Sequence, residues 1–154
     1  MRVTSTGIKE GHWEKKFGKH GHDFIDGIPA LSVPFAIHHP PERTKSFALI
    51  LKDNDAVAVA GFPWIHWLAA NIEHENVAED ESRTTHDFVQ GRNSWGINFY
   101  GGMTPPDKPH RYDLHIYALD KILDLQDGFG EEDLEKAMAG HIHDSYILSA
   151  MYEN

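Results

Sequence analysis

The chain has 154 residues, 40% of them hydrophobic, and a formal net charge of −10. This size and composition fit one globular domain over residues 1–154, which can fold without stabilising disulfide bonds or metal ions. The negative charge disfavours general binding to nucleic acids or anionic membranes, and the absence of cysteine excludes disulfides and thiol catalysis.

The N-terminal half contains several predicted extended segments. The first thirty residues are rich in glycine, histidine and charge, which predicts irregular structure with a short strand at most. Residues 29–35 have a proline near each end, which is typical of an extended edge segment. Short apolar runs at 46–52 and 65–71 predict two buried strands.

Two loops and a strand are predicted next. Residues 73–90 are acidic and lack periodicity, which predicts a solvated surface loop, and residues 91–109 are dense in glycine and proline, which predicts a long shaped loop. Residues 111–119 alternate, and this pattern predicts a strand with two distinct faces. One face carries Tyr112, Leu114, Ile116 and Ala118, and the other carries Asp113, His115 and Tyr117.

The C-terminal segment contains the clearest helix. Residues 131–140 begin with acidic residues, place Leu134 and Met138 on one face, and end at Gly140. We predict a short helix or turn at 141–146 and a final strand at 147–152. Because strands dominate and the clear helix comes late, a mainly β, or α+β, fold is favoured over an alternating α/β fold.

No segment at the N-terminus is apolar enough for a signal peptide, and no run approaches the roughly 20 apolar residues of a membrane span. We therefore expect a cytoplasmic location and no integral membrane segment.

Three blocks of sequence resemble those of a known family. The first joins Lys-Asp-Asn-Asp-Ala at 52–56 to Gly-Phe-Pro-Trp-Ile-His-Trp at 61–67. The second is the glycine-rich loop and the His-Arg-Tyr strand within 91–120, and the third is Lys-Ala-Met-Ala-Gly-His-Ile at 136–142. In this order and spacing they resemble the phosphatidylethanolamine-binding protein (PEBP) family, in its bacterial and archaeal Raf-kinase-inhibitor-like branch. The resemblance runs over nearly the whole chain from about residue 24.

The resemblance implies a large central antiparallel sheet, a smaller second sheet and short C-terminal helices. It also implies a small pocket at one end of the sheet, used for phosphate or phospholipid headgroups.

Two departures from the family pattern stand out. Asn54 and Val57 replace prolines of the turn, and Met103-Thr104 replaces smaller residues of the pocket loop. We expect Met103 to fold over the pocket entrance and Thr104 to add a hydroxyl group.

His66 and His110 are the strongest candidates for ligand contacts. Two imidazoles that face one cavity can each donate a hydrogen bond to a phosphate oxygen when suitably protonated. Asp53 beside them would orient one ring and raise its pKa. Asp55 is expected to cap backbone N–H groups of the turn, and Arg111 to point away from the pocket.

Four further residues complete the predicted ligand-binding set. Gly101 and Gly102 permit close backbone approach, and their N–H groups could cradle an oxyanion. Tyr112 shares the strand face of His110 and would add a hydroxyl donor, while Trp64 shares the face of His66 and would form a wall.

Other functional motifs are weak or missing. The pairs His20/His22 and His141/His143 have a spacing that can chelate a divalent metal, but no third ligand is arranged by motif. We therefore predict no dedicated metal site and no cofactor. The sequence contains no nucleophile elbow, Walker loop or dinucleotide fingerprint.

The favoured function is the binding of a small anion by a protein that is not an enzyme and that regulates a partner protein. One alternative is a protein-interaction module that inhibits a serine protease or a kinase through exposed loops. A second alternative is a hydrolase in which His66, His110 and Asp53 perform acid–base chemistry. A two-fold homodimer is the commonest form that an oligomer would take.

Overall fold

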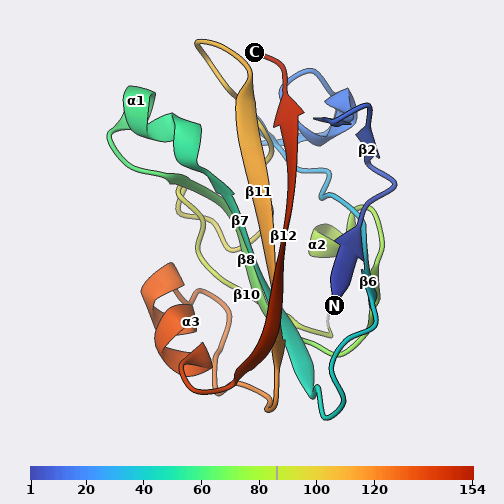
Figure 1. The fold of residues 1–154 in the computed structure, drawn as a ribbon. Helices are drawn as coiled ribbons and strands as arrows, with labels where there is room; N and C mark the ends of the chain where they lie inside the picture. The colour runs from blue at the N-terminus through green and yellow to red at the C-terminus, as the bar shows by residue number, and fades with distance from the viewer. Residues whose placement is uncertain (86) are drawn as a thin grey trace.

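The computed structural model describes residues 1–85 and 87–154, and its main element is a seven-stranded sheet in the order β10-β8-β7-β11-β12-β3-β2. Neighbouring strands are antiparallel except β12 and β3, which run parallel. The long central strands lie side by side in Figure 1. They are β7 (Ser46–Asp53), β8 (Trp64–Ile72), β11 (His110–Leu119) and β12 (Ile142–Tyr152). The predicted mainly β fold is confirmed.

Short strands complete the sheets. The seven-stranded sheet also contains β2 (Ile8–Lys9), β3 (His12–Trp13) and β10 (Val89–Gln90). A three-stranded sheet consists of β1 (Arg2–Thr4), β6 (Phe35–His38) and β9 (Asn76–Val77), and a two-stranded sheet of β4 (Phe24–Ile25) and β5 (Ile28–Pro29).

The helices of the described residues are short, and none is long and apolar enough to cross a membrane. They are α1 (Val57–Ala60), α2 (Glu81–Thr84) and α3 (Glu131–Met138), with 3₁₀ turns at Lys15–Phe17 and Asn54–Ala56.

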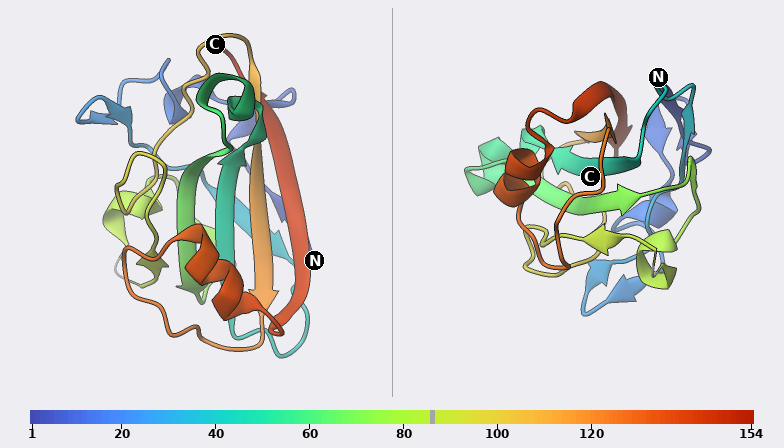
Figure 2. Two further views of the ribbon diagram at one scale, coloured as in Figure 1. Left: turned by 90° about the vertical axis from the view of Figure 1, so that its left-hand side faces the viewer. Right: turned by 90° about the horizontal axis from the view of Figure 1, so that it is seen from below.

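The central sheet is covered on both faces. One face packs against the N-terminal segments and the three-stranded sheet, through side chains such as Trp13, Phe17 and Phe35. The other face packs against Leu134 and Met138 of α3, which lies across the sheet in Figure 2. Because both faces of β7 are covered, its residues are apolar almost without interruption, as the run at 46–52 predicts.

The main strands and the helix agree with the sequence predictions, but the segment after the helix does not. The runs at 46–52 and 65–71 form β7 and β8, and the helix predicted at 131–140 is α3. The prediction of a helix or turn at 141–146 is wrong, because β12 begins at Ile142 and pairs with β11 along its whole length. After the exposed Ile142, its first residues are the polar run His143, Asp144 and Ser145, which lacks an apolar alternation.

A buried polar network fixes the loop that follows β10. Ser82 Oγ donates to Gln90 Oε1 (2.6 Å) and accepts from the backbone N–H of Tyr100 (2.9 Å). Trp67 Nε1 donates to the same Gln90 oxygen (2.8 Å), which ties α2 and this loop to β8. The prediction of a solvated loop over 73–90 is therefore wrong at Ser82 and Gln90, which are both buried.

We predict that Ser82→Ala lowers the free energy of unfolding by about 1–3 kcal/mol, because it leaves the buried N–H of Tyr100 without an acceptor. Urea denaturation followed by circular dichroism measures the change. Ser145→Ala is the matched control, since Ser145 is exposed, and it should change stability by less than about 0.5 kcal/mol. Equal stability of the Ser82 and Ser145 variants would contradict the structural role of the network.

Candidate functional site

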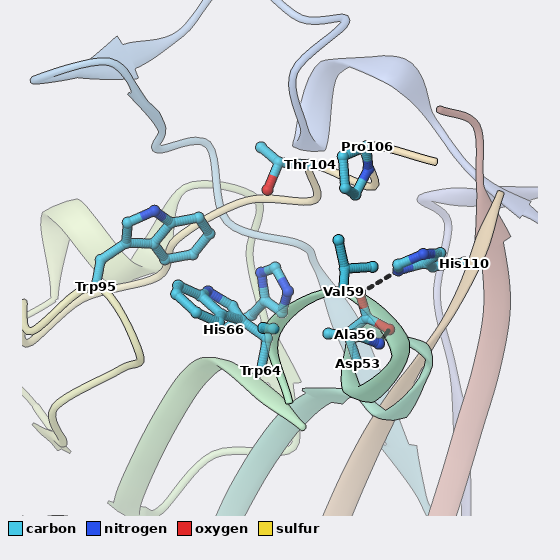
Figure 3. Close-up of a pocket in the computed structure, with 10 residues that line it drawn as sticks. Asp53, Ala56, Val59, Trp64, His66, Trp95, Thr104, Pro106 and His110 are labelled. Atoms are coloured by element: carbon cyan, nitrogen blue, oxygen red, sulfur yellow. Dashed lines mark hydrogen bonds and ion pairs between the residues drawn. The ribbon is translucent and has the colours of Figure 1, made fainter. Parts of the chain in front are cut away.

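A cavity of about 210 Å³ opens at one end of the central sheet, where β7 ends and β8 and β11 begin. Figure 3 shows the side chains around it, which come from the three strands, from the turn and helix after β7, and from the long loop before β11. The lining residues are Asp53, Ala56, Val59, Ala60, Trp64, His66, Trp95, Thr104, Pro106 and His110.

The strand register explains why the polar residues meet there. Asp53, the last residue of β7, is paired with Trp64 of β8 on one side and with Tyr112 of β11 on the other. Side chains of directly paired residues share a face, and so do side chains two positions apart on one strand. His66 and His110 therefore lie on the same face as Asp53.

Asp53 is a buried carboxylate with both oxygens bonded. Its Oδ1 accepts from the backbone N–H of Ala56 (3.1 Å), so that it caps the 3₁₀ turn after β7. Its Oδ2 accepts from Nδ1 of His110 (2.6 Å). Burial raises the pKa of Asp53, and the hydrogen bond from His110 offsets part of that rise.

The neighbouring charged residues hold the start of β11. Asp55 accepts from the backbone N–H of Arg111 (2.8 Å), so the cap of the turn that we expected from Asp55 is supplied by Asp53. Arg111 is exposed and forms an ion pair with Asp113 (3.1 Å), which agrees with its expected position away from the pocket.

His110 lies between two carboxylates. Its Nδ1 contacts Asp53 and its Nε2 contacts Oδ1 of Asp107, each at 2.6 Å. Burial lowers the pKa of His110, but the hydrogen bonds to Asp53 and Asp107 outweigh this effect and hold that pKa above its ordinary value. The hydrogen bond from His110 in turn holds the pKa of the exposed Asp107 below its ordinary range. A doubly protonated His110 ring therefore has both of its N–H groups engaged by carboxylates.

His66 has the opposite character. Its Nδ1 donates to the carbonyl oxygen of Gly101 (2.8 Å), an atom that can only accept. Burial lowers the pKa of His66 to about 4, so the ring is neutral at physiological pH and its Nε2 is a hydrogen-bond acceptor. The expected pair of donors thus consists of one donor, His110, and one acceptor, His66.

The two glycines of the pocket loop do not cradle an anion. The N–H of Gly101 donates to the carbonyl of His66 and that of Gly102 to the carbonyl of Pro29, each at 2.8 Å. The predicted oxyanion cradle is therefore wrong. The glycines permit close packing instead, since a Cβ at Gly101 would overlap the ring of Trp95. Trp95 forms a cavity wall that the sequence reasoning missed.

Trp64 lines the cavity, whereas Tyr112 is fully buried and is not among the lining residues. The Tyr112 ring packs between the two histidines, with its centroid 5.1 Å from that of His66 and 6.4 Å from that of His110. Burial raises the pKa of Tyr112, so its hydroxyl stays protonated. Among the described residues, neither this hydroxyl nor Nε1 of Trp64 has a hydrogen-bond partner.

Met103 and Thr104, which depart from the family pattern in the pocket loop, occupy different environments. Met103 is fully buried and belongs to the core around Phe17, so the expectation that it covers the entrance is wrong. Thr104 lines the cavity, and its hydroxyl points inward in Figure 3.

Three of the four histidines in these two pairs have other contacts. His141 and His143 both bond to the carboxylate of Asp120, at 2.8 and 3.0 Å, and His20 stacks on Tyr152. Within residues 1–85 and 87–154, no group of three potential ligands is placed to hold a metal ion.

Comparison with known proteins agrees with this architecture. A sequence profile of the phosphatidylethanolamine-binding protein family matches residues 4–153. The uncharacterized protein YxkA of Bacillus subtilis is 40% identical over 131 residues, which cover 76% of this chain and 78% of that protein. A UPF0098 protein of Methanothermobacter thermautotrophicus is 36% identical over 127 residues, which cover 79% and 82%.

Two crystal structures share the fold over nearly their whole length. A PEBP homolog from Chlamydia trachomatis is 33% identical with a TM-score of 0.85, and the match covers 99% of this chain and 96% of that one. Escherichia coli YbcL, described as a member of the mammalian PEBP family, is 27% identical with a TM-score of 0.84 and coverages of 99% and 98%. The chain therefore belongs to the phosphatidylethanolamine-binding protein family, among its bacterial and archaeal members.

Proposed function

We propose that this protein binds a small oxyanion, such as a phosphate or a carboxylate, in the cavity between His66 and His110. The observation that carries the proposal is the position of His110 Nε2, a charged donor whose present partner is the carboxylate of Asp107 (2.6 Å). This N–H thus already holds an anionic group. Because Asp107 lies on the rim and its side chain is 42% exposed, a ligand oxygen could take its place.

The rest of the cavity supports the same proposal. The buried carboxylate of Asp53 stabilises the imidazolium form of His110 through Nδ1. The N–H at Nε2 of the same ring is then available to an anion. Thr104 adds a hydroxyl that can donate to an oxyanion, and Trp64 forms an aromatic wall. A volume of about 210 Å³ suits a phosphate or a small phosphate ester better than a whole phospholipid.

We propose binding rather than catalysis for the same cavity. A general base needs a free lone pair, and both ring nitrogens of His110 bond to carboxylates. His66 has a free lone pair at Nε2, but its pKa of about 4 makes it a weak base. The hydroxyl that lines the cavity belongs to Thr104, and no hydrogen bond joins it to either histidine among the described contacts. These contacts do not form the nucleophile–base–orienter chain of a hydrolase.

We predict that Asp107→Asn raises the affinity for inorganic phosphate several-fold, up to about tenfold, because it removes a competing anion from His110. Isothermal titration calorimetry at mildly acidic pH measures the change. Asp124→Asn is the matched control, because it changes the net charge by the same amount. Asp124 lies far from the cavity, since its neighbour Leu123 bonds to Asn71 at the opposite end of β8.

The two variants separate the explanations. Equal gains in both would mean that the gain comes from net charge, and an unchanged Asp107 variant would show that its carboxylate does not compete. Absence of phosphate binding in the wild type and in both variants would overturn the proposed function itself.

We also predict that affinity for acetate is constant at mildly acidic pH and falls as pH rises through the raised pKa of His110, because the ring then loses its positive charge. Acetate keeps one charge over this range, so the change reports the protein. Titrations monitored by NMR at a series of pH values provide the profile. His143→Asn, at an exposed position, should leave it unchanged. A flat profile from mildly acidic to mildly alkaline pH would rule out His110 as the charged donor.

A further inference from the structure

The ring of His66 lines the cavity and is held in one orientation. It is 1% exposed and is held by reciprocal bonds of 2.8 Å with Gly101, from Nδ1 to the glycine carbonyl and from the glycine N–H to the His66 carbonyl. The rings of Trp95 and Tyr112 pack edge-on against it at centroid distances of 5.3 and 5.1 Å. In the part of the chain that the structure describes, no hydrogen bond reaches its Nε2.

The chemistry of this atom follows from its partners. The Gly101 carbonyl can only accept, so Nδ1 must carry the proton of the neutral ring and Nε2 must carry the lone pair. In the described part of the chain, no carboxylate forms a hydrogen bond with the His66 ring. The nearby charge of His110 also disfavours a positive charge on His66. With a pKa lowered by burial to about 4, His66 accepts hydrogen bonds throughout the physiological range.

The other polar groups that line the cavity differ from His66, which is neutral and can only accept at its free nitrogen. Both oxygens of Asp53 are occupied, by the N–H of Ala56 and by His110. The indole of Trp64 can only donate, and the hydroxyl of Thr104 can donate or accept. The cavity thus presents a charged donor at His110 and a neutral acceptor at His66.

We infer that His66 makes the cavity selective for oxyanions that keep a proton on one oxygen, such as hydrogen phosphate, phosphonate or phosphate-ester monoanions. This inference rests on the proposed function, since it concerns the same cavity. The ligand's O–H donates to Nε2 of His66, and an unprotonated oxygen accepts from Nε2–H of His110. A sulfonate has the same tetrahedral shape but no O–H, so its oxygen would face the lone pair of His66. An unpaired acceptor in a buried site costs free energy, and sites built to bond a ligand O–H reject analogues that lack it.

Methylphosphonate and methanesulfonate test the inference directly. At mildly acidic pH both carry one negative charge and have nearly the same size, and they differ by one proton on oxygen. We expect the wild-type protein to bind methylphosphonate at least about tenfold more tightly in calorimetric titrations. Equal affinities would overturn the inference while the proposed function stands. If neither anion binds, and phosphate does not bind either, the proposed function itself has failed.

A variant and a spectroscopic measurement place the effect on His66. In His66→Phe the ratio of the two affinities should fall to about one, whereas His115→Phe, at a half-buried strand position on the other face of β11, should keep the wild-type ratio. Long-range ¹H–¹⁵N NMR of the wild type does not depend on the folding of a variant. It should show a neutral His66 ring with the proton on Nδ1, and a proton on Nε2 in the free protein would overturn the inference.

Discussion

A buried carboxylate needs a partner, and in this fold Asp53 finds one in His110 across two adjacent strands. Removing one member of such a buried pair typically costs about 3–5 kcal/mol, because the other charge is left uncompensated. The same carboxylate caps the turn that leads into α1, so one side chain sets both the wall of the cavity and the charge of its histidine. The other ring nitrogen of that histidine contacts Asp107, and it is the atom that we propose binds an anion.

The two histidines of the cavity differ because their partners differ. Both are almost completely buried, but His110 contacts two carboxylates and His66 contacts a backbone carbonyl. Carboxylates stabilise the imidazolium, whereas burial beside an uncharged acceptor favours the neutral ring. A donor and an acceptor therefore arise from the same residue type within one cavity. In the function proposed above, this difference would let the site recognise the protonation state of a ligand as well as its charge.

Local sequence patterns predict the framework better than the details of the site. The apolar runs of β7 and β8, the alternation of β11 and the acidic start of α3 are properties of short segments, so the sequence predicts them. The register of those strands then brings Asp53, Trp64, His66 and His110 together, as the family resemblance implies. The contacts of Asp107, Trp95 and the two loop glycines depend on how the long loop folds back on the sheet, and no local pattern encodes that path. Met103 shows the same limit, because a core position within a loop has no periodic signal.

The central claim is that His110 is a doubly protonated ring held between two carboxylates. A pH titration of the His110 ring nitrogens by long-range ¹H–¹⁵N NMR, on the wild-type protein without added anions, tests it most directly. Both nitrogens should be protonated at neutral pH, and the midpoint of the titration should lie above the ordinary histidine value of about 6.5. A single protonated nitrogen at neutral pH, with a midpoint at or below that value, would contradict the account.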